Sequence, residues 1–286
     1  MHVAVLGATG VIGRHLVPLL TGRGHRVRAI VRDPSKAGEL ASGGADIATG
    51  DILDPATLVP AFAGCEAVVN AASAVPRPGG DTGWQTNTRI RTEGTSNVID
   101  AAQAAGVGRI IHQSVAMVHR SENGAWVDET SPLSPTPQTQ SAVDLETIAC
   151  SGGIDWQIVR GGLFYGPGTG REDYYREAAR TGTLAIPGDG SDYLSPLHIA
   201  DMAGAIAHIL EHAPANSAWL AVDDRPLTWR DFIVRVCVDA GVTLPERFAD
   251  NPLPSFRCRN ARLRALGWSP RYPAFAPDAS AASQSR

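Results

Sequence analysis

Short apolar runs alternate with longer amphipathic segments along the first part of the chain. Helical spacing of apolar residues marks Gly13–Gly22 and Gly94–Ala105. The apolar runs that predict strands are Val3–Leu6, Arg26–Arg32, Ala45–Ala48, Ala67–Ala71, Arg109–Ser114 and Trp156–Arg160. Strands that alternate with helices at this spacing predict βαβ units with right-handed crossovers. The pattern therefore predicts an α/β fold with a doubly wound parallel sheet, and it excludes the all-α and all-β classes.

The pattern changes beyond Tyr165, where glycine- and proline-rich loops separate short helices. The helices expected there are Asp173–Thr181, Ile199–His212 and Trp229–Ala240. We interpret this region as a smaller part that covers the substrate. Before it, Ser131–Pro137 is a loop that enters a helix over Gln138–Cys150, with Thr136 as N-cap and Pro137 in the first position.

Composition and charge narrow the classes of function. The 286 residues carry a formal net charge of −4, and no cluster of lysine and arginine suggests a nucleic-acid partner. No apolar run approaches the roughly 18 residues of a membrane span, and Met1–Leu6 has the pattern of a buried strand instead of a signal peptide. The four cysteines form no CxxC pair, which favours a cytoplasmic protein without a disulfide or zinc framework.

A glycine-rich turn joins the first strand to the first helix. Its sequence is Gly7-Ala-Thr-Gly10-Val-Ile-Gly13. Glycines at these positions allow a tight turn, a close approach to a pyrophosphate and close packing of helix on strand. The alternative is an ordinary glycine-rich turn, but the strand–turn–helix context predicts a Rossmann-type dinucleotide site.

The end of the second strand indicates which dinucleotide binds. NAD-binding proteins usually hold the adenosine ribose with a carboxylate at this point, whereas here the strand ends in Val31-Arg32. Arg32 can bind a 2′-phosphate bidentately, and Lys36 adds a second positive charge. The alternative is a solvated surface arginine, and our interpretation is NADP(H).

Several segments together resemble the extended short-chain dehydrogenase/reductase family, also called the NAD-dependent epimerase/dehydratase family. They are Gly7–Gly13, Gly50-Asp51-Ile52, Asn70-Ala71-Ala72, Gly94-Thr95, Arg160–Gly168, Pro196–Asp201 and Leu266–Pro270. The resemblance implies that Asp51 and Ile52 meet the adenine, that the segment 71–73 lines the ribose and diphosphate, and that the segment 162–164 passes near the nicotinamide. The expected cofactor-binding residues are Gly7, Thr9, Gly10, Val11, Ile12, Gly13, Arg32, Lys36, Asp51, Ile52, Ala71, Ala72, Ser73, Ser114, Gly162, Leu163 and Phe164.

The chain departs from this family at its catalytic positions. The family uses a serine and a Tyr-x-x-x-Lys pair, with a glutamate four residues beyond the lysine. Counted back from Glu146, the tyrosine position is Gln138 and the lysine position is Ala142, and no tyrosine or lysine lies between residues 121 and 164. Val115 stands at the catalytic serine position, and Arg91 replaces a common asparagine. The chain resembles an atypical branch that lacks the Tyr-x-x-x-Lys pair.

Two residues remain as candidate catalytic groups. Ser114 ends the fifth strand, at the sheet edge where ligands bind, although a serine there can also cap a backbone group. His119 is the nearest group that titrates near neutrality, and the alternative is a loop histidine that faces solvent. The substrate region offers Gln138, Tyr174, Tyr175 and Tyr193.

The segment His208–His212 matches a reversed zincin pattern, HxxEH. Its position at a helix end, where histidine suits the helix dipole, favours a structural role, and we predict no metal. Tyr165 belongs to the Tyr-Gly-Pro-Gly turn, where we expect packing and not catalysis.

These observations predict a cytoplasmic NADP(H)-dependent oxidoreductase for a small or medium organic carbonyl, hydroxyl or double bond. Two alternatives stay open: a non-redox isomerase, epimerase or dehydratase, and a non-catalytic NADP(H) sensor. The family's dimer-forming helices would be Gly94–Ala105 and Gln138–Cys150, which implies a homodimer. We expect a dinucleotide-binding domain over 1–165, to which 195–212 return, a substrate-covering part over 166–194 and 213–275, and a disordered tail over 276–286.

Overall fold

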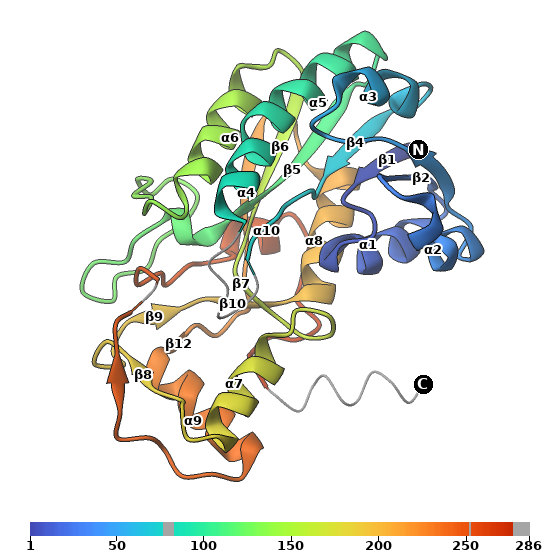
Figure 1. Ribbon diagram of the computed structural model, residues 1–286. Coiled ribbons are helices and arrows are strands. Elements are labelled where there is room, and N and C mark those ends of the chain that lie inside the picture. The colour runs from blue at the N-terminus through green and yellow to red at the C-terminus, as the bar shows by residue number, and fades with distance from the viewer. Residues whose placement is uncertain (77–82, 252, 277–286) are drawn as a thin grey trace.

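A seven-stranded sheet forms the centre of the molecule (Figure 1). The computed structural model describes residues 1–76, 83–251 and 253–276. The strands follow the order β11-β6-β5-β4-β1-β2-β3, and every neighbouring pair is parallel. They are β1 (His2–Leu6), β2 (Arg26–Val31), β3 (Asp46–Thr49), β4 (Ala67–Asn70), β5 (Arg109–Val115), β6 (Asp155–Gly161) and β11 (Ser217–Ala221). The predicted doubly wound parallel sheet is confirmed.

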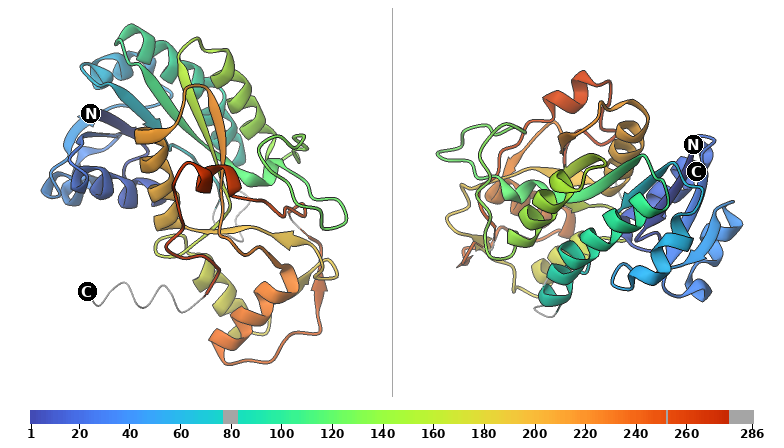
Figure 2. Two further views of the ribbon diagram at one scale, coloured as in Figure 1. Left: turned by 180° about the vertical axis from the view of Figure 1, so that it is seen from behind. Right: turned by 90° about the horizontal axis from the view of Figure 1, so that it is seen from above.

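Helices cover both faces of this sheet (Figures 1 and 2). Helices α1 and α8 pack together on one face, and α3, α5 and α6 pack on the other. The helices are α1 (Val11–Gly22), α2 (Gly38–Ser42), α3 (Pro55–Phe62), α4 (Trp84–Arg91), α5 (Glu93–Ala104), α6 (Gln140–Ser151), α7 (Arg171–Arg180), α8 (Ile199–His212), α9 (Trp229–Ala240) and α10 (Ala261–Ala265).

Strand β1 shows how the sequence builds two cores from one strand. Val3 and Val5 point into the core that includes α1 and α8, whereas Ala4 and Leu6 point into the core that includes α3 and α5. Successive side chains of a strand face opposite sides of the sheet. A strand that is covered on both faces therefore has a continuously apolar sequence.

A smaller lobe lies below the carboxyl edge of the sheet in Figure 1. Its core packs α7 against α9 around the buried side chains of Trp229, Phe232 and Phe256. Its short strand pairs are β7 (Leu163–Tyr165) with β10 (Pro196–His198), β9 (Tyr193–Leu194) with β12 (Leu227–Thr228), and β8 (Ile186–Pro187) with β13 (Phe248–Ala249).

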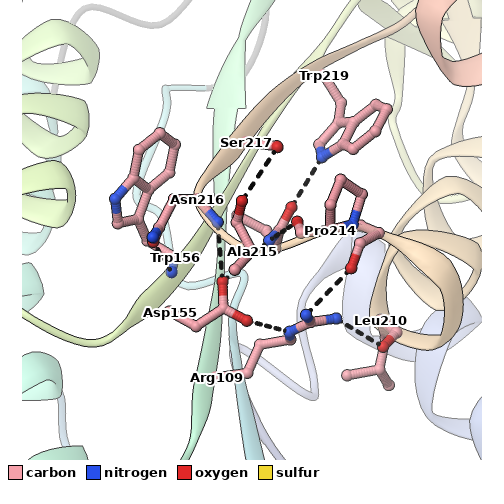
Figure 3. Close-up of polar contacts among 11 residues, drawn as sticks. Arg109, Asp155, Trp156, Leu210, Pro214, Ala215, Asn216, Ser217 and Trp219 are labelled. Carbon is pink, nitrogen blue, oxygen red and sulfur yellow. Dashed lines mark hydrogen bonds and ion pairs between the residues drawn. The ribbon is translucent and has the colours of Figure 1, made fainter.

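Strand β11 corrects the expected division of the chain. We assigned residues 213–275 to the substrate-covering part, but β11 pairs with β6 and extends the main sheet. Figure 3 shows the polar contacts around its start, where Asp155 accepts hydrogen bonds from Arg109 (2.6 Å) and from the backbone of Asn216 (3.0 Å). Arg109 also donates to the carbonyl of Leu210 at the end of α8 (3.2 Å). These contacts between distant segments hold the edge strand in place.

Several helical details also differ from the expectation. Helix α6 begins at Gln140, because residues 137–139 form a turn in which the Thr139 hydroxyl accepts a hydrogen bond from the Thr136 backbone (2.8 Å). Thr136 is therefore not the N-cap. Helices α3 and α4 were not predicted, since α3 is short and α4 is polar along most of its length.

Other expectations concern whole-chain properties. The expected tail over 276–286 lies, except for Ala276, outside the described residues. All four cysteines are free thiols. Within the described residues, no helix combines the length and apolarity needed to cross a membrane.

Candidate functional site at the carboxyl edge of the sheet

The turn between β1 and α1 requires glycine at two positions. Gly7 has a φ of +73°, and a Cβ there would lie 2.7 Å from the Ala71 carbonyl oxygen. A Cβ on Gly13 would lie 2.3 Å from the carbonyl oxygens of both Gly7 and Ala8. Any larger residue would push the turn away from β4 and from the helix. The sequence motif is therefore a close-packed cradle at the point where β1 and β4 end.

This cradle fits a negatively charged group. Gly10 is the N-cap of α1, it is exposed, and its backbone closes the turn on the Gly7 carbonyl (2.9 Å). The first turn of α1 carries no acidic residue, and no side chain caps its amide groups. Free amides at a helix N-terminus bind phosphate well. Thr9, Val11 and Ile12, which we expected to contact the cofactor, lie in this same turn.

Arg32 lies at the end of β2 on the same edge. Its side chain is exposed, and no described residue pairs with its guanidinium. Lys36 is different, because it already faces the Asp33 carboxylate at 3.5 Å. Asp33 also accepts a hydrogen bond from the Ser35 hydroxyl (2.6 Å). Arg32 is thus the freer of the two cations that we expected to meet a 2′-phosphate.

Asp51 and Ile52 occupy the next loop. One Asp51 carboxylate oxygen accepts a hydrogen bond from the Leu53 backbone (2.9 Å). Ile52 is buried, and a Cβ on Gly94 would lie 2.8 Å from its Cγ1 atom. The Gly94-Thr95 motif therefore lets α5 approach this loop closely. The adenine contacts of both residues remain predictions, as do the cofactor contacts of Ala71, Ala72 and Ser73 at the end of β4.

Ser114 belongs to a buried polar network between α6, β5 and β6. Its hydroxyl donates to a Glu146 carboxylate oxygen at 2.6 Å. Arg160 donates to the same carboxylate through Nε (3.0 Å) and Nη2 (2.7 Å). The Nη1 atom of Arg160 also lies 3.0 Å from the Nε2 atom of His119. The structure thus brings both candidate catalytic residues into one cluster, in which the Ser114 hydroxyl is already bonded to a carboxylate.

His119 does not face solvent, so that alternative from the sequence is wrong. Its side chain is fully buried, and its neighbour across an isolated β-bridge is Leu133. Burial, and then the positive charge of Arg160, lowers the pKa of His119 to about 4. A histidine with this pKa is neutral at pH 7. Because the Arg160 guanidinium can only donate, Nε2 of His119 accepts in this contact.

Gln138 and Ala142, which the family resemblance aligns with its tyrosine and lysine, lie just before and within the first turn of α6. Gln138 is exposed in the turn before α6, and Ala142 is fully buried in the first turn of that helix. Arg91, the residue in place of the family's asparagine, ends α4 and is only 3% exposed. Burial lowers the pKa of Arg91 to about 10, and the nearby Glu146 carboxylate opposes that shift.

The segment expected near the nicotinamide follows β6. A Cβ on Gly162 would lie 2.3 Å from the Ser195 carbonyl oxygen, so this residue also has no room for a side chain. Leu163 is buried, and the carbonyl of Phe164 accepts a hydrogen bond from the Arg171 side chain (2.8 Å). The sequence analysis did not single out Arg171, because only the fold brings α7 beside this strand.

Tyr165 packs in the interior. Its hydroxyl donates to Asp223 at 2.9 Å, and burial raises its pKa. Burial likewise raises the pKa of Asp223 to about 8. The tyrosines of the expected substrate region differ in exposure: Tyr174 is exposed, Tyr175 packs against Phe232 in the smaller lobe, and the Tyr193 ring lies under Arg257.

The HxxEH segment makes contacts that do not converge on a metal. His208 bonds to the Leu266 carbonyl (3.0 Å), while Glu211 bonds to Arg23 (2.8 Å) and His25 (2.9 Å). Over residues 1–76, 83–251 and 253–276, no group of three or more histidine, cysteine, aspartate or glutamate side chains is arranged to hold a metal ion.

The chain is similar to known NAD(P)H-binding proteins and reductases. A family model described as NAD(P)H-binding matches residues 7–212. The chain is 33% identical over 303 residues to a 3-diazoavenalumate denitrifying reductase from Streptomyces sp, with 96% of this chain and 98% of the relative covered. It is 30% identical over 259 residues to a 2-alkyl-3-oxoalkanoate reductase from Stenotrophomonas maltophilia, with 84% and 76% covered. A dTDP-glucose 4,6-dehydratase structure from Streptomyces venezuelae shares the fold, with a TM-score of 0.85, 23% identity and 99% and 96% coverage.

Proposed function

Because the chain belongs to the extended short-chain dehydrogenase/reductase family, we propose that it is an NADP(H)-dependent oxidoreductase. Its substrate would be a small or medium organic compound with a reducible carbonyl or double bond, or the corresponding alcohol. The observation that carries the NADP(H) assignment is the end of β2, where Arg32 is exposed and has no partner among the described residues, and where the strand offers no carboxylate. Two relatives that the chain matches over most of its length are named as reductases.

The residues at the sheet edge fit a bound dinucleotide. The Gly7–Gly13 turn and the first amides of α1 would hold the diphosphate, and Arg32 would hold the 2′-phosphate. The cofactor supplies a hydride when it is bound. The Gly162–Phe164 segment packs closely against the Ser195 carbonyl and would form the wall against which the nicotinamide lies. Orientation of this kind contributes several kcal/mol to a rate without a side-chain acid.

Proton transfer in this site would differ from that of the family. The Ser114 hydroxyl donates to Glu146, and the Nε2 atom of His119 accepts from Arg160. The Ser114 proton is thus engaged, and neutral His119 carries its proton on the buried Nδ1 atom. Gln138 and Ala142 stand at the aligned tyrosine and lysine positions. We therefore assign the proton to solvent or to the substrate itself, and we treat Ser114 and His119 as residues that position the end of β5.

The rate of reduction should consequently show little dependence on pH from about 5.5 to 9. No tyrosine stands at the aligned catalytic position, and His119, with its pKa lowered to about 4, stays neutral throughout this interval. A kcat profile measured across the interval tests this expectation. A step near pH 6.5 that disappears in the His119→Gln variant would assign acid–base catalysis to His119 after all.

The substrate screen should begin with organic acids. Both relatives named above carry names of carboxylates, an avenalumate and an oxoalkanoate. Stereospecifically deuterated NADPH is incubated with such acids and with uncharged ketones, and the products are examined for deuterium. Label in a product supports the proposed function.

The same experiment separates the alternatives. The structural similarity to a dTDP-glucose 4,6-dehydratase favours a non-redox isomerase, epimerase or dehydratase as the second candidate. That activity would convert substrate while all label stays in the cofactor. Tight NADPH binding without conversion of any compound would instead indicate an NADP(H) sensor.

Arg32→Ala should weaken NADPH binding by about 1.5–3 kcal/mol, the range for a hydrogen bond to a charged group, and leave NADH binding nearly unchanged. The matched control is Lys36→Ala, for which we expect a smaller loss, because Lys36 already faces Asp33. Isothermal titration calorimetry with both cofactors measures the difference. Equal losses for NADPH and NADH in Arg32→Ala would contradict the assignment of NADP(H).

A further inference from the structure

Three charged side chains are buried together where α4, α6 and β6 meet. Arg91 is 3% exposed, Glu146 is 4% exposed and Arg160 is 6% exposed. The Glu146 carboxylate is already well satisfied, because it accepts hydrogen bonds from Nε and Nη2 of Arg160 and from the Ser114 hydroxyl. Arg160 and Glu146 thus form a complete ion pair, and Arg91 is a second cation beside it.

The charges of this cluster do not balance. Two guanidinium groups contribute two positive charges, Glu146 contributes one negative charge, and the buried His119 is neutral at pH 7. Among the described residues, the Glu146 carboxylate opposes the burial that lowers the pKa of Arg91. A buried cation without its own counter-ion is costly, and proteins usually pair such a charge. Among the described residues the cluster thus carries a net charge of about +1, which an anionic ligand would balance.

The position of Arg91 shows where that anion would bind. Asn87, one turn earlier on α4, is fully buried, and its side-chain oxygen accepts a hydrogen bond from the Ala74 backbone (3.0 Å). Its side-chain nitrogen is buried without a hydrogen-bond partner. Ala74 directly follows the segment 71–73 that we expect to line the cofactor. Helix α6 packs against α4, and on α6 the fully buried Ala142, one turn before Glu146, carries only a methyl group.

We infer that Arg91 binds the carboxylate of an organic acid substrate in the proposed active site. A guanidinium can hold a carboxylate through two parallel hydrogen bonds, which fixes the orientation of the rest of the molecule. Ala142 adds no further cation at the position that aligns with the family's lysine. The inference rests on the proposed function in taking the bound acid to be the substrate. Anion binding by Arg91 can be measured separately.

The test compares an acid with its uncharged ester in two variants and a control. The probes are 3-oxooctanoate and methyl 3-oxooctanoate, titrated calorimetrically into the NADPH-loaded protein. Arg91→Met keeps the apolar length without the charge, and Arg91→Lys keeps the charge without the bidentate geometry. Arg89→Ala, on the same helix, removes an exposed arginine that pairs with Glu93 (2.9 Å) and serves as the matched control.

We expect the native protein and Arg89→Ala to bind the acid more tightly than the ester. In Arg91→Met, binding of the acid should fall by about 10- to 100-fold while binding of the ester stays the same, and Arg91→Lys should recover part of the loss. Equal weakening of acid and ester in Arg91→Met, an unchanged affinity for the acid, or no preference of the native protein for the acid would each overturn the inference.

Thermal unfolding provides a readout that a merely structural arginine would not give. Removal of an unbalanced buried cation should leave the melting temperature of Arg91→Met equal to or above that of the native protein. The acid should raise the melting temperature of the native protein but not that of Arg91→Met. A large drop in the melting temperature of Arg91→Met, with no acid-dependent difference, overturns the inference. The same titrations without NADPH keep the result interpretable if cofactor binding, and with it the proposed function, fails.

Discussion

Replacement of Glu146 by alanine is expected to lower the free energy of unfolding by about 3–5 kcal/mol, the cost of breaking a buried ion pair by removing one partner. The carboxylate receives hydrogen bonds from Arg160 and Ser114 in the protein interior. Its removal leaves Arg160 and Arg91 as two buried cations with no described anion between them. The Ser114 hydroxyl would also lose its acceptor, which adds to the penalty.

Urea denaturation of the native protein and the variant measures this loss. The matched control is Glu93→Ala, which removes an exposed carboxylate paired with Arg89 and should cost less than about 1 kcal/mol. The double variant Glu146→Leu with Arg160→Met should recover part of the stability, because apolar side chains of similar volume replace the pair. A loss below about 1 kcal/mol in Glu146→Ala would show that water reaches this cluster in solution.

The sheet was predictable because each of its first six strands follows a local pattern. Runs such as Val3–Leu6 are apolar on both faces, and the chain returns through a helix after each one. The seventh strand lacks this signal. Ser217–Ala221 contains no β-branched residue, and distant residues such as Asp155 and Arg109 hold its start in place. Contacts between such distant residues leave no local sequence pattern from which the strand could be predicted.

The candidate site likewise has a part that the sequence predicts and a part that it does not. The glycine turn was predictable because backbone geometry demands glycine at Gly7 and Gly13, and a residue type that geometry requires is visible in the sequence. The surroundings of His119 were not predictable, because its burial depends on Arg160, which lies 41 positions further along the chain. Arg91 was visible as a departure from the family motif. Its place beside an already paired carboxylate became apparent only in the fold.

We expect a tyrosine and a lysine introduced at the aligned positions 138 and 142 to act as a catalytic pair only if the charge of Arg91 is removed at the same time. Ala142 is fully buried, so a lysine there would be a third cation around the single Glu146 carboxylate. We therefore expect Gln138→Tyr with Ala142→Lys to be destabilised and inactive in the native background. Addition of Arg91→Asn, which restores the residue common in the family, should return the number of cations around Glu146 to two and relieve the added repulsion.

The triple variant Arg91→Asn, Gln138→Tyr, Ala142→Lys should reduce an uncharged activated ketone faster than the native protein by about 10²–10⁴-fold, the contribution of a positioned general acid. Oxidation of NADPH in the presence of 2,2,2-trifluoroacetophenone measures the rate, and this ketone avoids the carboxylate that Arg91 is proposed to bind. A version with Gln138→Phe in place of Gln138→Tyr lacks the phenol hydroxyl and should show no gain. Its pH profile should also lack the tyrosine step that the triple variant acquires. If the triple variant folds and binds NADPH but gains no activity, the turn over residues 137–139 holds position 138 away from the nicotinamide, and the alignment of Gln138 with the family's tyrosine is wrong.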